Sequence, residues 1–277
     1  MDLGQFLLLV LLGLLAAGYG TLIGASGSFI LVPSLLFLYP GEPPTHIAPV
    51  TLAVSFFSAL SGSVSYGRQG RIDYRGGLIL IVGMVAGGVL GAFSTAFLDR
   101  RTFELVVGTF LIGVSLYQIG VSAYLRIHNH HNHDHEVTTS ETDDPPGVLH
   151  THVFHPVVGI GSSSAVGFVA GLVGIGGGPL LVPILVRLLH FPVHEATGTA
   201  LFVILPQVMA GTLEHAWAGH FARELWLRVL PLALGVIGGA QLGTRFSRRV
   251  HSNVILRILY LSLGAMGIAL IARALVV

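Results

Sequence analysis

The sequence predicts an all-α polytopic membrane protein made of two inverted homologous repeats, each a glycine-broken helical hairpin followed by three transmembrane helices. The first observation is composition: hydrophobic residues make up 53% of the 277 residues, charged residues only 10%, and the mean hydropathy is +0.81. A soluble domain carries about 25% charged residues, because it needs them to cover its surface. The net charge of +1 gives no electrostatic reason to expect a nucleic-acid partner.

The second observation is a glycine motif that occurs twice, 150 residues apart. Residues 24–33 read GASGSFILVP, residues 174–183 read GIGGGPLLVP, and five of the ten positions are identical. Backbone that leaves a helix inside a membrane is tolerated only where protein buries it or where it lines a cavity. Matched helix breaks in two halves of a chain point to the binding site of a transporter. The other interpretation is that these glycines only allow helices to pack closely.

The apolar stretches divide the chain into a first repeat (1–125), a polar His-rich linker (126–152) and a second repeat (153–277). The stretches are 6–39, 47–66, 78–98 and 103–125, then 153–189, 196–217, 225–246 and 254–277. A spanning helix needs about 20 residues, so the three later stretches of each repeat fit one crossing apiece. The first stretch of each repeat is longer, and we expect a hairpin with arms of about 18 and about 12 residues.

The hairpin returns the chain to its starting side, and the three crossings that follow leave it on the opposite side of the membrane. The second repeat therefore starts from the other side and is expected to lie upside down relative to the first. The loops 68–75 and 245–249 each hold three arginines, and the loops expected on the opposite face hold two each. The positive-inside tendency then places the three-arginine loops and the linker in the cytoplasm, with both termini outside.

Both glycine bends are suited to an anion. A helix that begins inside the membrane leaves its first four N–H groups without an intrahelical partner, and its dipole adds positive potential there. Two threonines lie early in the helices that follow, where each hydroxyl either donates to a substrate or bonds back to its own helix. The candidate substrate-binding residues are therefore Gly24, Ser26, Gly27, Ser28, Thr51, Gly174, Gly176, Gly177, Gly178 and Thr199.

Other residues are assigned supporting roles. Pro33 and Pro183 are expected to start or kink the returning arm, because proline lacks the N–H of a continuing helix. Glu214 and His215 form an ionisable pair near a helix end, which is either a proton relay or a pair that reaches interfacial water. Close and mobile helix contacts are expected at Gly62, Gly70, Gly87, Gly88, Gly238 and Gly239.

The linker contains a histidine tract. Such tracts bind Zn, Ni or Cu in some proteins and are plain flexible connections in others. The candidate ligands are His128, His130, His131, His133 and His135. No cofactor is expected.

Three features together resemble the TauE/SafE family of sulfite and organosulfonate exporters or permeases. They are the paired bends ending in Leu-Val-Pro, the pattern YGRQGRID at 66–73 and the pattern GGVLG at 87–91. The resemblance covers the chain apart from the linker, and implies an inner-membrane carrier for small sulfur-containing anions. The first bend departs from the glycine run of the second, because it holds Ala25, Ser26 and Ser28.

The sequence thus predicts a secondary anion transporter that works by alternating access, not an enzyme. Three alternatives stay open: a divalent metal transporter that uses the linker, an anion channel with the same bends, and a membrane enzyme built on Glu214 and His215. The chain carries no P-loop, so ATP-driven transport by this chain alone is not expected. The substrate and the oligomeric state are left open.

Overall fold

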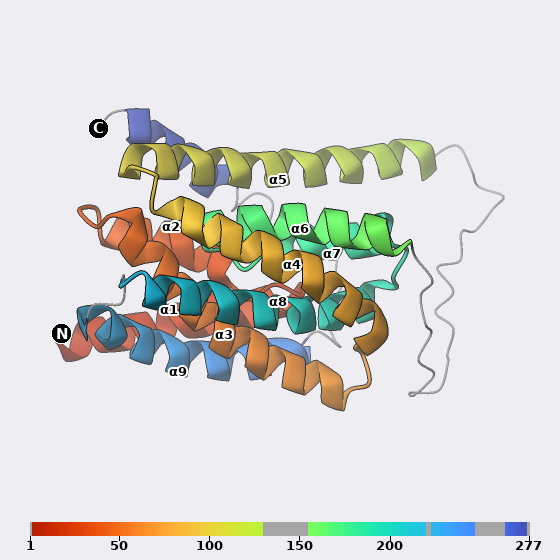
Figure 1. Cartoon of the computed structure of the whole chain (residues 1–277), viewed down its shortest axis with the longest axis horizontal. Coiled ribbons are helices and arrows are strands. Elements are labelled where there is room, and N and C mark those ends of the chain that lie inside the picture. The colour runs from red at the N-terminus through yellow and green to blue at the C-terminus, as the bar shows by residue number, and fades with distance from the viewer. Residues whose placement is uncertain (1, 130–154, 220–222, 247–263, 276–277) are drawn as a thin grey trace. The chain divides into compact units, whose positions relative to one another are not determined.

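The computed structural model describes residues 2–129, 155–219, 223–246 and 264–275, and the regular elements in these residues are all helices (Figure 1). The labelled helices are α1 (Leu3–Leu22), α2 (Ser28–Leu38), α3 (Pro44–Arg68), α4 (Tyr74–Thr95), α5 (Arg100–Asn129), α6 (Pro156–Val173), α7 (Gly178–Arg187), α8 (Val193–Trp217) and α9 (Arg223–Phe246). A further short helix covers Gly264–Leu275. The chain packs as two compact units, Met1–Phe103 with His150–Val250, and Glu104–Leu149 with His251–Val277.

Six of the described helices are long and apolar enough to cross a membrane, namely α1, α3, α4, α6, α8 and α9. Of the remaining predicted crossings, 103–125 lies within α5, and the first part of 254–277 lies outside the described residues.

The two predicted hairpins have the expected proportions. Their arms are 20 and 11 residues in α1 and α2, and 18 and 10 residues in α6 and α7. At 1.5 Å per residue the short arms reach about 15–17 Å, which is about half the thickness of a bilayer's hydrocarbon core. The first residues of both short arms, Ser28 and Gly178, are buried in the protein.

Two runs of glycines at four-residue spacing hold the long helices of the first unit together. Gly83, Gly87 and Gly91 of α4 form the first glycine seam: a Cβ atom added there would lie 2.2, 2.0 and 2.0 Å from carbonyl oxygens of α6. Gly235, Gly239 and Gly243 of α9 form the second seam, where a Cβ atom would lie 2.1, 2.2 and 2.2 Å from carbonyl oxygens of α1. Residues four apart share one helix face, so each run lets two backbones touch directly.

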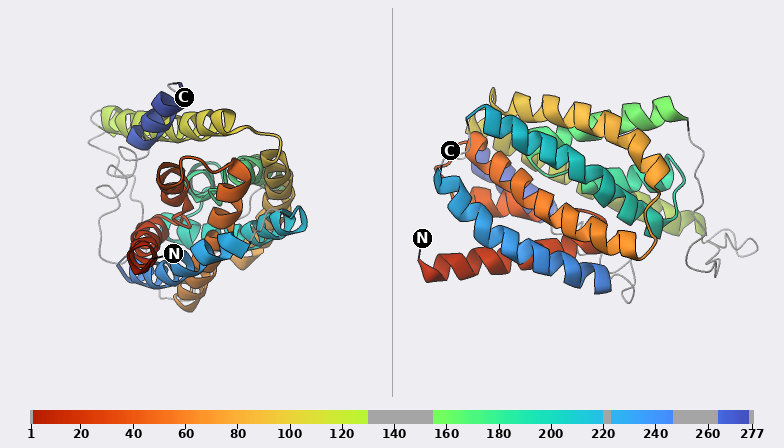
Figure 2. Two further views of the ribbon diagram at one scale, coloured as in Figure 1. Left: turned by 90° about the vertical axis from the view of Figure 1, so that its left-hand side faces the viewer. Right: turned by 60° about the horizontal axis from the view of Figure 1, so that its bottom comes forward.

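Each seam joins one half of the sequence to the other. Figure 2 shows α1, in dark red, beside α9, in blue, and α4, in gold, beside α6, in green. The long arm of each hairpin therefore packs on a helix from the opposite half. Of the glycines expected to make close contacts, Gly87 and Gly239 lie in the seams, Gly62 and Gly88 approach side chains of α8, and an added Cβ at Gly70 or Gly238 would have nothing within 4 Å.

Helices α3 and α8 cross at the centre of the first unit. A Cβ atom on Gly62 would lie 2.8 Å from Leu201 Cδ1, and one on Gly211 would lie 3.2 Å from Leu52 Cδ1. The two contacts are reciprocal, because Gly62 and Gly211 differ by 149 in number, as Leu52 and Leu201 do. The helices therefore run antiparallel, and each of the two contacts is the counterpart of the other.

In the second unit, α5 packs on the short helix Gly264–Leu275 through small residues. A Cβ atom on Gly108 would lie 2.7 Å from Ile271 Cγ1, and one on Gly264 would lie 2.8 Å from Ser115 Oγ. This contact uses the same close-packing principle as the seams.

The first seam predicts the effect of a single methyl group. Gly87→Ala places a Cβ atom 2.0 Å from the carbonyl oxygen of Ser164, so α4 and α6 must separate. We expect a loss of about 1–3 kcal/mol of stability, as for other overpacked sites, measured as a lower melting temperature in detergent. The matched controls are Gly161→Ala and Gly238→Ala, which add a Cβ atom with nothing within 4 Å. They should melt at or above the wild-type temperature, because alanine favours a helix. Equal melting of all three variants would contradict direct backbone contact at the seam.

Candidate functional site

The two helix bends have nearly the same backbone conformation. Gly24 and Gly174 have φ angles of 75° and 77°, and the helix N-caps Gly27 and Gly177 both have φ of 77°. Hydrogen bonds from residues 25 and 175 back to the carbonyls of Gly20 and Ala170 close the ends of the long arms, at 2.8 and 3.0 Å. Glycine is needed at these four positions because the left-handed conformation strains residues with a Cβ atom.

The bends lie against each other and form a bend junction, defined here as residues 24–28 and 174–178. The Ser28 hydroxyl donates a short hydrogen bond to the carbonyl oxygen of Ile175, and Ser26 Oγ lies 2.7 Å from Ser28 Oγ. A Cβ atom on Gly176 would lie 2.8 Å from Ser26 Oγ, and one on Gly178 would lie 2.4 Å from Ala25 Cα. This explains why the first motif has Ala25 and Ser26 where the second has other residues. Their atoms occupy the space that Gly176 and Gly178 leave open.

The junction concentrates unsatisfied backbone donors. Helices α2 and α7 both begin there, with Ser28 and Gly178 as their first residues. Within the described residues, the amides of Ser28, Phe29 and Gly178 donate to no protein acceptor, while Pro179 has no N–H to donate. Ser26 and Ser28 are 0% exposed, so these donors lie in the protein interior. Two positive helix ends at one buried point are suited to bind an anion.

Of the two candidate threonines, only Thr51 is brought to a bend. Its Oγ1 would lie 2.7 Å from a Cβ atom on Gly174, although it also donates to its own helix at Ile47 and Ala48. Thr199 Oγ1 instead accepts from the backbone N–H of Asp73 at 2.9 Å.

Thr197 lies at the first bend, which sequence reasoning missed. A Cβ atom on Gly24 would lie 2.7 Å from Thr197 Cα, as one on Gly174 would lie 3.1 Å from Ala48 Cα. Thr197 and Ala48 differ by 149, whereas pairing Thr51 with Thr199 assumes 148. The sequence did contain the correct offset of 149 residues, in the match of Gly62 with Gly211 and of Gly70 with Gly219.

Pro33 and Pro183 occupy the sixth position of their short arms, inside α2 and α7. They are therefore placed to bend these helices after the first turn, since a proline inside a helix removes one hydrogen bond. Their gating role stays a prediction.

The ionisable pair lies near the end of α8. The His215 side chain is fully buried, and its Nδ1 lies 3.4 Å from Glu214 Oε2. The corresponding residue of α3, Tyr66, is also buried and donates to the carbonyl oxygen of Thr21, at 2.9 Å, in the last turn before the first bend. The two positions are alike in burial and differ in chemistry.

The described residues contain no group of three or more His, Cys, Asp or Glu side chains that could hold a metal ion. Of the histidine tract, His130, His131, His133 and His135 lie outside the described residues, and His128 belongs to the last turn of α5.

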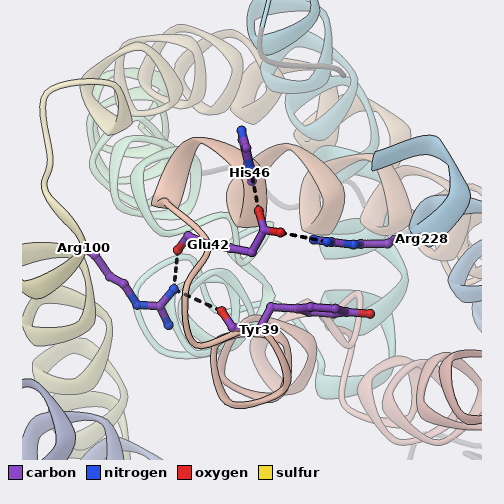
Figure 3. A network of polar contacts seen from close by, with 5 residues as sticks. All are labelled: Tyr39, Glu42, His46, Arg100 and Arg228. Carbon is purple, nitrogen blue, oxygen red and sulfur yellow. Dashed lines mark hydrogen bonds and ion pairs between the residues drawn. The ribbon is translucent and has the colours of Figure 1, made fainter. Parts of the chain in front are cut away.

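A second polar group, the Glu42 cluster, ties the loop after α2 to other helices (Figure 3). Glu42 Oε1 accepts from Arg228 Nη2 of α9 at 2.8 Å, and its Oε2 lies 2.5 Å from His46 Nδ1. The Arg228 guanidinium also covers the Tyr39 ring, 4.0 Å from its centroid. The hydrogen bond from Arg228, and secondarily the one from His46, holds the pKa of Glu42 below its ordinary value of 4.5.

Arg100 also belongs to the cluster, and it contacts backbone carbonyl oxygens rather than side chains. Its guanidinium donates to the carbonyl oxygens of Leu36 and Tyr39, at 3.1 Å each, and to that of Glu42. The carbonyls of Leu36 and Tyr39 lie at the end of α2, where no further turn of the helix donates to them, so the Arg100 side chain caps this helix end. The cluster therefore fixes where the first short arm ends.

The fold and the junction define a class: an integral membrane protein whose helices break in the protein interior, as in transporters. The family model described as "Sulfite exporter TauE/SafE" matches residues 9–270. The chain belongs to the TauE/SafE sulfite exporter family, and it is a membrane transporter.

Curated relatives agree with this class. The chain is 33% identical to "Probable membrane transporter protein YunE" of Bacillus subtilis over 273 residues, which cover 96% of this chain and 97% of the relative. It is 26% identical to "Probable membrane transporter protein YdhB" of the same organism, with 96% and 97% covered. It is 23% identical to "Probable membrane transporter protein MJ0441" of Methanocaldococcus jannaschii, with 94% and 93% covered. No solved structure matches the chain.

The Glu42 cluster predicts a pH-dependent contribution to stability. Because the pKa of Glu42 is lowered in the folded protein, its contribution is present above pH 4.5 and is lost as pH falls through the folded value. The side chain is 24% exposed, so the contribution is about 1 kcal/mol or less. Glu42→Gln should therefore melt below the wild type at pH 7, and the difference should shrink when the pH is brought below 4.5.

Arg228→Gln tests the same contact from its other side. In a double-mutant cycle at pH 7, the Glu42→Gln and Arg228→Gln losses should sum to more than the loss in the double variant. Additive losses would mean that the ion pair contributes nothing to stability.

Proposed function

We propose that this protein is a secondary transporter of small anions, specifically sulfur oxyanions or organosulfonates, which it binds at the bend junction. The observation that carries the proposal is the meeting of two helix N-termini at a buried point, where the amides of Ser28, Phe29 and Gly178 have no protein acceptor among the described residues. A buried anion there is stabilised by N–H groups and helix dipoles without a cationic side chain. The family name adds the sulfur chemistry.

The proposed mechanism is alternating access between two inverted repeats. The reciprocal contacts of α3 and α8 support a pseudo-two-fold axis through their crossing, and the matched glycine seams support two similar bundles. The seams pack α6 directly on α4 and α1 directly on α9. In the proposed mechanism each of these two helix pairs moves as a rigid body. Rocking of these bodies about the junction would expose the anion to one side at a time.

We propose an inner-membrane location with both termini outside and the linker inside. Ser65 Oγ and Thr244 Oγ1 lie 2.7 Å apart, which brings together the helix ends that precede the two three-arginine loops. Arg100 and Arg228 gather at the Glu42 cluster instead. This grouping of loops is the one that the positive-inside tendency requires.

We also propose that Glu214 and His215 carry the coupled proton, since they are ionisable, lie close together in α8, and the His215 side chain is fully buried. The alternative metal transporter has no supporting cluster among the described residues.

Binding to purified protein tests the proposal. Calorimetry should show saturable binding of sulfite or a small sulfonate to the wild type, and no saturable response to chloride or divalent metals. Ser28→Ala removes the hydrogen bond between the bends, and Gly178→Ala adds a Cβ atom 2.4 Å from Ala25 Cα. Each should weaken anion binding by about tenfold or more, since a hydrogen-bonded charge site loses that much when its geometry is disturbed.

Matched controls separate the junction from general damage. Ser162→Ala removes a hydroxyl that bonds only within α6, and Gly161→Ala adds a Cβ atom in open space. Both should bind the anion like the wild type. Saturable binding of metal alone by the wild type, or unchanged anion affinity in a folded Ser28→Ala protein, would overturn the proposal.

A further inference from the structure

Gln207 of α8 is a buried polar side chain whose amide makes no hydrogen bond within the described residues. It is 0% exposed, and neither its amide nitrogen nor its amide oxygen has a hydrogen-bond partner within the described part of the chain. Because both ends of the amide are without partners, this holds whichever way round the amide is placed. Gln241 of α9 shows the ordinary case, since its amide donates to the backbone and hydroxyl oxygens of Ser61. A buried unpaired amide is costly, so its presence calls for an explanation.

Gln207 is linked to the second bend through its neighbours in α8 and α4. Its neighbour Val208 has Cγ1 3.4 Å from the position of a Cβ atom on Gly176. Across from it, Met84 of α4 reaches Gly177, with Cε 2.4 Å from a Cβ position there. One helical turn further along α4, a Cβ atom on Gly88 would lie 2.8 Å from Gln207 Nε2. Gln207 therefore lies on the face of α8 that packs against α4, one turn along α4 from the methionine that reaches the second bend.

The corresponding position of the first half also holds an unsatisfied polar group. Ser58 and Gln207 differ by 149, the spacing that relates Gly62 to Gly211. Ser58 is 0% exposed and its hydroxyl has no hydrogen-bond partner within the described residues. Two buried polar side chains thus lie at matched positions of the central helix pair, one in each half.

We propose that Gln207 is a substrate-reading residue, which selects oxyanions that carry a hydroxyl group of their own. The inference rests on the proposed anion site. The junction amides can only donate hydrogen bonds. The Gln207 amide brings both a donor, Nε2, and an acceptor, Oε1, and the acceptor can pair with an O–H that the anion itself carries. The ligand class is a singly charged sulfonate or hydrogensulfite that bears an O–H donor.

The test uses two ligands that differ by one hydroxyl. 2-Hydroxyethanesulfonate and ethanesulfonate are titrated into the wild type and into Gln207→Met, which keeps the length of the side chain and removes the amide. The wild type should prefer the hydroxylated ligand by about fivefold or more, the worth of one hydrogen bond. Gln207→Met should lose this preference and bind ethanesulfonate as the wild type does. Its melting temperature should equal or exceed that of the wild type, because no protein hydrogen bond is lost.

Gln241→Met is the matched control, since it breaks hydrogen bonds to Ser61 away from the junction. It should melt at a lower temperature and keep the preference. If Gln207→Met does not fold, the preference of the wild type and of Gln207→Leu decides the inference. Equal affinity of the wild type for both ligands, or a preference retained without the amide, overturns the role of Gln207 and leaves the anion site standing. If the wild type binds neither sulfonate nor hydrogensulfite, the proposed function fails as well.

Discussion

The structure depends on one constraint, which is that backbone polar groups inside a membrane must find partners within the protein. Each hairpin breaks this rule at its bend, where Ser28 and Phe29 in one half and Gly178 in the other leave amides unpaired. Burying the two bends against each other keeps the unpaired groups away from lipid. It also brings these amides close together, so that the N–H groups left unpaired by the two helix breaks can donate to one ligand.

The glycine seams provide the stiffness that such a junction needs. Contact between Gly87 and the carbonyl of Ser164, and between Gly239 and that of Leu14, leaves no side chains between the helix backbones. Backbone-to-backbone contacts have no rotamers to relax, so each pair of helices behaves as one body. Under the proposed alternating-access mechanism, movement would take place at the bends and at the crossing of α3 and α8.

The outer end of the first short arm is held by side chains rather than by glycines. Arg100 caps the carbonyls at the end of α2, and Glu42 pairs with Arg228 of α9. The first short arm is thus held at its outer end by Arg100 and at its inner end by the hydrogen bond from Ser28 to the second bend. A movement of α9 relative to the loop after α2 has to break the ion pair between Glu42 and Arg228, which links that loop to the opposite half of the sequence.

The sequence by itself determined the helical membrane class, the position of both helix breaks and the proportions of the hairpin arms. These follow from hydropathy, from length and from glycines at left-handed positions, which are local properties. Only the tertiary structure decided which bend faces which helix, that Thr197 rather than Thr199 lies at the first bend, and that Gln207 is buried without a partner. The glycine runs of α4 and α9 were visible in the sequence, but their partners were not. Contacts between the two halves depend on a helix register, and a shift of one residue, from 148 to 149, turns a side chain by about 100° around its helix.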